Sequence, residues 1–256
     1  MHDGIFDPGH GGRDPGAIGK NGTREADINL IMAKKVAALL LPVMNIEFTR
    51  STDISLGNTL SSDLAARVKK ANQSNSDIFV SFHCNSSTSA SAHGAEIYTT
   101  KGDTGADALA TCVINRMEAD LPELTFRKDL SDGDPDKEAG FYVLKNTRMP
   151  AVLIELAFIS NPREEALLNS LEFQDRAALS IAKGICDFFG ITLPKQTPSD
   201  TVTVVSNGKK IQGKLIGNET WVPLRPVVES LGHALEVNWG DTNNTVLIKT
   251  SADGFR

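Results

Sequence analysis

The chain has few cysteines and no long hydrophobic stretch. Its 256 residues include only three cysteines, Cys84, Cys112 and Cys186, which stand far apart in apolar or helical surroundings. An odd number at such spacing does not support a disulfide framework or a cysteine-rich zinc knot, so we expect free, mostly buried thiols. The longest apolar runs, such as Ala37–Leu41 and Ala151–Leu156, are far shorter than the roughly 18 to 20 residues of a membrane helix. We therefore expect no integral membrane segment.

Basic residues are fewer than acidic ones. The chain carries 26 Lys and Arg against 32 Asp and Glu, a net charge of −6, and so offers no broad basic surface for nucleic acid. The first residues, Met1–Phe6, lack the basic segment and the apolar region of a secretory signal peptide. Either the protein is made without a signal, or the sequence starts after its cleavage point. Nucleic acid is not an expected partner, and the sequence leaves the oligomeric state open.

What is present is enough for a packed core, because 40% of the residues are apolar. One segment, residues 194–200, reads Pro-Lys-Gln-Thr-Pro-Ser-Asp and has the composition of a linker. The residues after it carry a net charge of +1, whereas those up to residue 200 carry −7. We predict a larger domain over residues 1–193, a linker over 194–200 and a small domain over 201–256.

Short apolar runs alternate with longer helical patterns in the larger domain. The predicted strands are Gly4–Phe6, Ile46–Thr49, Ile78–Phe82, Ala95–Thr100, Phe141–Leu144 and Ala151–Leu156. The predicted helices are Glu25–Leu41, Ser61–Asn75, Asp107–Asp120 and a helical pair that begins at Asn161-Pro162 and runs to Phe189. This alternation predicts an α/β fold, a twisted mixed sheet flanked by helices.

The last 56 residues show a different pattern, with short strands separated by turns. The predicted elements are strands at Val202–Val205, Lys210–Ile216, Thr220–Val222, Leu235–Asn238 and Val246–Thr250, and a short helix at Val227–Leu231. Asn and Gly residues occupy the intervening turns. The pattern predicts a second, small, strand-rich α+β domain.

Two of the five histidines stand where a predicted strand gives way to a loop. His10 follows the first strand through Asp7-Pro8-Gly9, and His83 ends the run Ile78–Phe82. Ligands of open α/β sheets bind at the carboxyl ends of the strands. A single histidine there is more often a loop residue hydrogen-bonded to backbone, but two at one edge of a sheet favour a metal site.

Glu155 is an acidic residue inside an apolar run, Ala151–Phe158, that is typical of a strand covered on both faces. An ionised carboxylate buried there without a partner costs several kcal/mol, so something must compensate it. One interpretation is an ion pair with a buried arginine such as Arg67 or Arg148. The stronger one is a cation with an activated water, for which a desolvated carboxylate of raised pKa is a suitable general base.

A catalytic zinc ion usually takes three protein ligands and leaves a position for water. A third ligand is therefore needed beside the two histidines. The spacing does not choose among Asp7, Asp14, Glu25 and Asp27. Glu25 opens the first helix after an expected cap at Thr23, where the helix dipole alone already favours an acidic residue.

Four separated motifs resemble, in order, the zinc-dependent N-acetylmuramoyl-L-alanine amidases across residues 3 to about 190. They are Asp7-Pro8-Gly9-His10-Gly11-Gly12 with Asp14 and Gly16-Ala17, then Glu25, then Ser81–Asn85, then Val152–Asn161. Thr49-Arg50, Asp53, Leu64, Arg67 and Ala71-Asn72 resemble the second strand and helix of that family. The resemblance implies that His10, Glu25 and His83 are zinc ligands and that Glu155 is the catalytic carboxylate. The departures, Phe6, Cys84 and Ala157, remove no functional group.

The resemblance also implies an activity and a partner. The expected reaction is hydrolysis of the amide bond between N-acetylmuramic acid and L-alanine in peptidoglycan, by a phage endolysin or a bacterial autolysin. The enzyme would act on the bacterial cell wall, reached from the host cytoplasm by an endolysin or after secretion by an autolysin. Two alternatives stay open: a zinc peptidase that cuts within the stem peptide, and a wall-binding protein without catalysis.

Residues 201–256 resemble, less specifically, the small copper amine oxidase N-terminal-like module. The matching residues are Val204, Asn207-Gly208-Lys209, Trp221–Arg225, Glu229–Gly232 and Val237-Asn238-Trp239. This segment has one histidine, His233, and no Cys or Met, so no copper site follows. Wall binding, assembly and a spacer role all remain open for it.

Overall fold

The computed structural model describes residues 1–102, 104–194, 201–206, 209–216, 219–221 and 227. The chain forms two compact units, Met1–Leu193 and Pro194–Arg256. All of the candidate site residues belong to the first unit. The predicted linker lies almost entirely outside the described residues.

A six-stranded mixed sheet forms the centre of the first unit, as predicted. Its strands are β1 (His2–Pro8), β2 (Met44–Phe48), β3 (Ile78–Asn85), β4 (Glu96–Thr99), β5 (Lys137–Glu138) and β6 (Ala151–Phe158), in the order β2-β1-β3-β6-β4-β5. The first four strands of this order are parallel to one another, and β4 pairs antiparallel with β6. The parallel strands therefore end at one edge of the sheet, which is where α/β proteins place their ligands.

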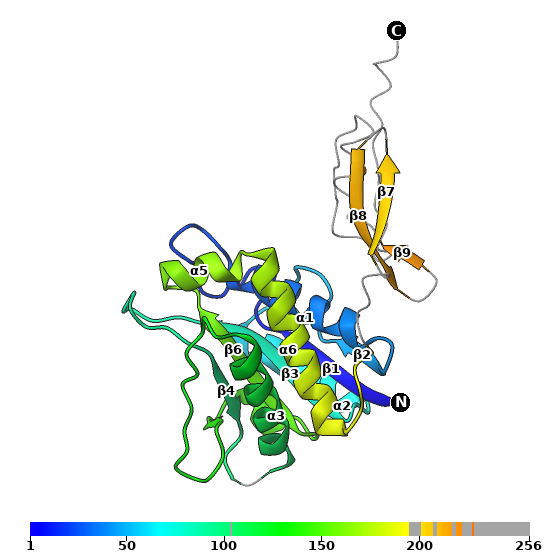
Figure 1. Cartoon of the computed structure of the whole chain (residues 1–256). Helices are drawn as coiled ribbons and strands as arrows, with labels where there is room; N and C mark the ends of the chain where they lie inside the picture. Colours follow the sequence, from blue (N-terminus) through cyan, green and yellow to red (C-terminus); the bar gives the residue numbers. More distant parts are fainter. Residues whose placement is uncertain (103, 195–200, 207–208, 217–218, 222–226, 228–256) are drawn as a thin grey trace. The chain divides into compact units, whose positions relative to one another are not determined.

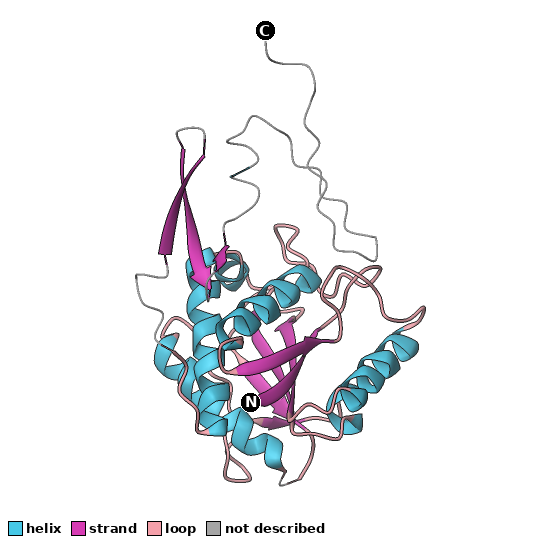
Figure 2. Cartoon of the chain, turned by 90° about the vertical axis from the view of Figure 1, so that its right-hand side faces the viewer, coloured by secondary structure: helices cyan, strands magenta, loops and turns pink. Residues whose placement is uncertain are grey.

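Helices cover both faces of the sheet (Figures 1 and 2). They are α1 (Glu25–Leu40), α2 (Leu60–Gln73), α3 (Gly105–Asp120), α4 (Tyr142–Asn146), α5 (Pro162–Leu168) and α6 (Leu171–Phe189). Apolar residues of α1, α3 and α6 form the larger core on one face, and those of α2 and α4 form the smaller core on the other. The fold class predicted from the alternating pattern is thus confirmed for this unit.

Side-chain caps fix most helix starts, but the start of α1 differs from the prediction. Asn161 caps α5 with Pro162 at its first position, as expected. The expected Thr23 cap of α1 is wrong, because the N-cap is Arg24 and no side chain caps this helix. The Thr23 hydroxyl instead accepts a hydrogen bond from Asn169 Nδ2 at 2.8 Å.

The predicted strand at Phe141–Leu144 is also wrong, since α4 occupies this segment. Val143 and Leu144 are buried in the smaller core, and the Asn146 side chain donates to the Tyr142 carbonyl at 2.8 Å. A run of four apolar residues has too little periodicity to distinguish a strand from one buried helical turn. The edge strand at this end of the sheet is β5 instead.

The second unit contains a three-stranded antiparallel sheet in its described part. Its strands are β7 (Thr201–Ser206), β8 (Lys209–Ile216) and β9 (Glu219–Trp221), paired in that order. These match the first three strands predicted there. Of the predicted helix only Val227 is described, and the strands predicted at Leu235–Asn238 and Val246–Thr250 lie outside the described residues.

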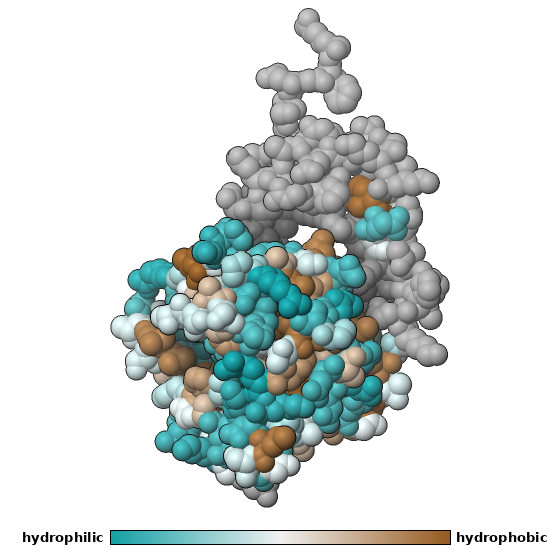
Figure 3. Space-filling view, turned by 60° about the vertical axis from the view of Figure 1, so that its left-hand side comes forward, coloured by the Kyte–Doolittle hydropathy of each residue, from teal (hydrophilic) through white to brown (hydrophobic). Residues whose placement is uncertain are grey.

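No described helix combines the length and apolarity needed to cross a bilayer. On the face of the first unit shown in Figure 3, hydrophobic residues are scattered among hydrophilic ones. The three cysteines are free, with Cys84 and Cys186 buried and Cys112 partly so, as their spacing predicted.

Candidate metal centre

The parallel strands bring the two predicted histidines together. His83 lies near the end of β3, and His10 follows β1 by two residues. The Gly9 amide between them donates to the Phe82 carbonyl at 3.0 Å, which fastens the loop after β1 to β3. The imidazole rings of His10 and His83 meet edge to face, with centroids 5.1 Å apart.

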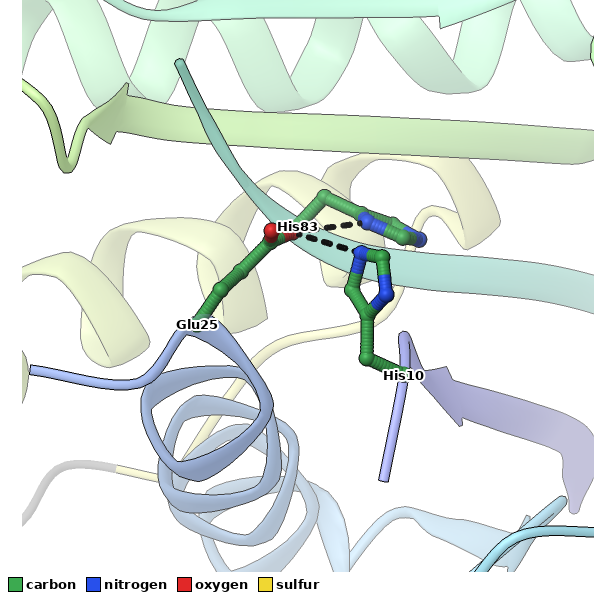
Figure 4. Close-up of side chains that lie close together, drawn as sticks. All are labelled: His10, Glu25 and His83. Atoms are coloured by element: carbon green, nitrogen blue, oxygen red, sulfur yellow. Dashed lines mark hydrogen bonds and ion pairs between the residues drawn. The ribbon is translucent and has the colours of Figure 1, made fainter. Parts of the chain in front are cut away.

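The carboxylate of Glu25, the first residue of α1, is directed at both histidines (Figure 4). Its Oε1 is 3.2 Å from His10 Nε2 and 3.0 Å from His83 Nδ1. The three candidate ligand atoms all lie within 4.8 Å of one another. Two donors that share one tetrahedral zinc at about 2.1 Å are roughly 3.4 Å apart. Two imidazoles and a carboxylate at this spacing therefore fit a zinc ion.

The surroundings of Glu25 keep its carboxylate charged. Its side chain is buried, Oε2 accepts from the Ala17 amide at 2.9 Å and Oε1 from the Cys84 amide at 3.2 Å. Burial raises the pKa of Glu25, but hydrogen bonds and charge from His10 and His83 outweigh it and leave the pKa well below its usual range. The carboxylate therefore carries its negative charge toward the histidines.

Asp14 lies behind His10. Its Oδ2 is 2.8 Å from His10 Nδ1, so a hydrogen bond there turns Nε2 toward Glu25. Burial lowers the pKa of His10, but its hydrogen bonds to Glu25 and Asp14 raise that pKa to about 9. A carboxylate behind a metal-ligating imidazole is the usual way in which proteins fix the ring and its tautomer.

The other two acidic alternatives have different partners. Asp7 is buried, pairs with Arg67 at 2.8 Å and accepts from Thr49 and Ser81. Asp27 pairs with Arg24 at 3.3 Å. Of the four acidic residues between which spacing could not choose, the structure brings only Glu25 against both histidines.

Glu155 lies beside this cluster as the direct neighbour of His83 in the β3 and β6 register. Its Oε2 is buried and has no hydrogen-bond partner among the described residues. Burial raises the pKa of Glu155 to about 7, with His83 lowering it and the charges of Glu25 and Glu96 raising it. A carboxylate with this pKa can both accept and release a proton near neutral pH.

The ion-pair interpretation of Glu155 is not supported. Arg67 pairs instead with Asp7 and with Asp63, the latter at 2.6 Å. Within the described part of the chain, no ion pair joins Arg148 or any other cation to Glu155. Among the described residues, the Glu155 carboxylate is thus left without a cationic ion-pair partner.

Glu96, which was not among the predicted site residues, lies directly opposite Glu155 in the β4 and β6 register. Glu96 is buried, and hydrogen bonds from Tyr98 at 2.6 Å, Lys137 at 2.9 Å and Arg127 lower its pKa despite the burial. Asn85 Nδ2 also donates to Glu96, at 2.8 Å. An acidic residue inside the apolar strand Ala95–Thr100 was the available signal, the same signal that drew attention to Glu155.

Comparisons with known proteins show the family of this chain. Residues 5–187 match the family model described as N-acetylmuramoyl-L-alanine amidase. The chain belongs to this amidase family. It is 35% identical to the N-acetylmuramoyl-L-alanine amidase LytC of Bacillus subtilis over 195 residues, covering 72% of this chain and 35% of LytC. It is 33% identical to the endolysin of Bacillus phage SPP1 over 191 residues, covering 73% of this chain and 65% of the endolysin.

Solved structures of amidases share the fold of the first unit. The N-acetylmuramoyl-L-alanine amidase AmiC2 of Nostoc punctiforme aligns with a TM-score of 0.65 at 31% identity, covering 74% of this chain and 97% of that one. The chain spans only 35 to 54% of the length of the first three curated relatives that it matches. The likeness therefore concerns the larger unit and not the whole of those proteins.

Proposed function

We propose that this chain hydrolyses the amide bond between N-acetylmuramic acid and L-alanine in peptidoglycan. His10, Glu25 and His83 would hold a zinc ion, and Glu155 would be the catalytic carboxylate. The observation that carries the proposal is the His-Glu-His cluster beside the part-buried Glu155, whose Oε2 is buried without a hydrogen-bond partner among the described residues, in a chain of the amidase family.

His10, Glu25 and His83 would hold the zinc ion, which would supply Lewis acidity for the scissile carbonyl and for a water molecule whose pKa would fall toward roughly 7. Glu25 and Asp14 adapt the site to a cation. Glu25 offsets part of the ion's charge, and Asp14 keeps His10 Nε2 turned toward Glu25.

Glu155 is suited to move a proton between the water and the leaving group. Its raised pKa allows it to accept the water's proton and then donate that proton to the nitrogen of L-alanine. Its place beside His83 in the sheet puts this carboxylate next to the ligand cluster. Without that proton the amine would leave as an unstable anion.

The two alternatives differ in substrate or in chemistry. A zinc peptidase acting within the stem peptide would use the same four residues, but the family and the named relatives favour the muramoyl amide. A wall-binding protein without catalysis would have no need for Glu155 to keep a buried oxygen, Oε2, without a hydrogen-bond partner next to the His-Glu-His cluster. Since relatives include a bacterial amidase and a phage endolysin, we propose the bacterial cell wall as the place of action for either origin.

Digestion of purified peptidoglycan distinguishes the bonds. We expect mass spectrometry of a complete digest to show free stem peptides with new L-alanine amino termini and glycan strands without new reducing ends. New amino termini inside the stem peptide, or released D-alanine, would identify a peptidase and refute the proposed bond. Intact murein after treatment with the zinc-loaded chain would favour the non-catalytic alternative.

We further propose that residues 201–256 form a separate wall-binding module. The support is the division into two compact units and the presence of every proposed site residue in Met1–Leu193. Shortening the chain to residues 1–193 should leave hydrolysis of a small soluble muramoyl peptide near the full-length rate. Activity on intact walls should fall, because tethering raises the effective substrate concentration.

Both arms of this truncation experiment have a contradicting result. Equal activity of the two proteins on intact walls would refute the anchor. Loss of soluble-substrate activity in a folded, zinc-loaded truncation would show that residues 201–256 help to form the catalytic cleft.

A further inference from the structure

Arg50, just after β2, is a buried cation whose acceptors are all backbone carbonyls. The residue is 1% exposed. Its Nε donates to the Pro8 carbonyl at 2.9 Å and its Nη1 to the Thr52 carbonyl at 3.0 Å. Its Nη2 donates to two carbonyls, those of Gly9 and Ala26, each at 2.8 Å. None of these acceptors carries a full negative charge, so the chain retains a buried positive charge without a bonded carboxylate.

The two carbonyls on Nη2 adjoin two of the proposed zinc ligands. Gly9 directly precedes His10, and Ala26 directly follows Glu25. One nitrogen atom thus joins the loop after β1 to the first turn of α1. Burial and the neighbouring Arg67 lower the pKa of Arg50 to about 10, which still leaves the guanidinium protonated at neutral pH.

Gly9 extends this connection to the third ligand. Its amide donates to the carbonyl of Phe82, the residue before His83, at 3.0 Å. A Cβ on Gly9 would lie 2.1 Å from His83 Cε1, so only glycine allows this approach. The Gly9 peptide and Arg50 together therefore link the backbone beside all three ligands.

The loop needs such support. His10 has a φ of 60°, a left-handed conformation that residues with a side chain rarely adopt without support from their surroundings. Arg67 holds the same loop through the His10 carbonyl at 2.6 Å and the Pro8 carbonyl at 2.7 Å, but its remaining bonds go to Asp7 and Asp63. Asn29 Nδ2 adds longer bonds of 3.3 Å to the Gly9 carbonyl and to Glu25 Oε1.

We propose that Arg50 is a positioning residue for the zinc site. By binding the Gly9 and Ala26 carbonyls with one guanidinium nitrogen, Arg50 holds His10 and Glu25 at ligand spacing before the metal binds. Only a planar fork of five donors reaches the carbonyls of three chain segments at once. The inference rests on the proposed function for the identity of the metal, and it concerns metal affinity rather than the bond that is cut.

The test measures the zinc dissociation constant of the full-length protein by competition with a chromogenic chelator. Arg50→Met keeps an unbranched side chain but removes the charge and all of the hydrogen-bond donors. Arg50→Lys keeps the charge but lacks the planar guanidinium group. Arg50→Met should weaken zinc binding about tenfold or more, the scale seen when groups that orient metal ligands are removed. Arg50→Lys should lie between Arg50→Met and the unaltered protein. The cobalt-substituted Arg50→Met protein should also show altered visible absorption bands.

Leu109→Ala is the control for general destabilisation, because Leu109 is fully buried on α3 and away from the loop and helix that carry the ligands. It should lower the melting temperature of the zinc-free protein without changing zinc affinity. Zinc affinity of a folded Arg50→Met protein within twofold of the unaltered one would overturn the proposal. So would an equal weakening in Leu109→Ala, and if Arg50→Met does not fold, unchanged affinity in Arg50→Lys would overturn it.

The unaltered protein separates this proposal from the proposed function. If it binds zinc through these residues but cuts another bond, the proposed function fails and the positioning role is still decided by the variants. If it binds no zinc at His10, Glu25 and His83, both fail before any variant is made.

Discussion

Replacing Glu155 with glutamine should reduce turnover of a soluble muramoyl peptide by about 100-fold or more, the scale of losing a general base. Glutamine has nearly the same shape as glutamate, but its amide group cannot accept the water's proton. The zinc content should remain near one ion per chain, because Glu155 is not among the three clustered ligand groups. Steady-state kinetics and metal analysis of the same preparation measure both effects.

The pH profile makes this prediction sharper. Below the pKa of Glu155, raised by burial to about 7, the carboxyl is protonated and cannot act as a base. The rate of the unaltered enzyme should therefore fall toward acid pH, and the residual rate of Glu155→Gln should lack that acid limb. Glu118→Gln, an exposed residue paired with Lys128 on the surface, should leave the profile unchanged. Near-normal turnover of zinc-loaded Glu155→Gln would refute the assignment of the base.

Removing either histidine ligand should act on metal binding itself. His10→Ala or His83→Ala leaves two of three protein donors, so we expect zinc affinity to fall by about 100-fold or more and activity to vanish at trace zinc. His93→Ala is the matched control, because His93 lies in an exposed loop and bonds only the Ser91 carbonyl nearby. Its zinc affinity should equal that of the unaltered chain.

Zinc binding should also release protons. Hydrogen bonds to Glu25 and Asp14 raise the pKa of His10 to about 9, so the metal must displace a proton from His10 at neutral pH. The measured affinity should therefore rise with pH up to about 9. Calorimetric titrations in buffers of different ionisation enthalpy measure the protons released. Unchanged affinity of His83→Ala, or release of no proton on binding, would contradict the ligand set.

The sequence predicted the sheet and the positions of both histidines because these depend on local patterns. Apolar runs of strand length alternate with helical patterns; His83 directly follows such a run, and His10 follows another after Asp7-Pro8-Gly9. The errors lie where a tertiary contact decides. Phe141–Leu144 becomes a helical turn by packing two adjacent apolar residues into the smaller core, and the Thr23 hydroxyl accepts a hydrogen bond from Asn169, which is 146 residues away.

The third ligand could not be chosen from spacing for the same reason. Asp7, Asp14 and Glu25 all come in or after the first strand. Only the folded chain shows that Asp7 pairs with Arg67 and that Asp14 hydrogen-bonds to His10 Nδ1. Resemblance to a family indicated Glu25, whereas periodicity did not. The position of Glu96 opposite Glu155 depends on the register of β4 against β6, which no local pattern contains.

The most direct measurement is an anomalous difference map, recorded on both sides of the zinc absorption edge, from crystals of the zinc-loaded full-length chain. We expect one strong peak next to His10 Nε2, Glu25 and His83 Nδ1, with the Glu155 carboxylate close to it. A peak elsewhere, a ligand set that includes Asp14 in place of Glu25, or no zinc peak at all would contradict it.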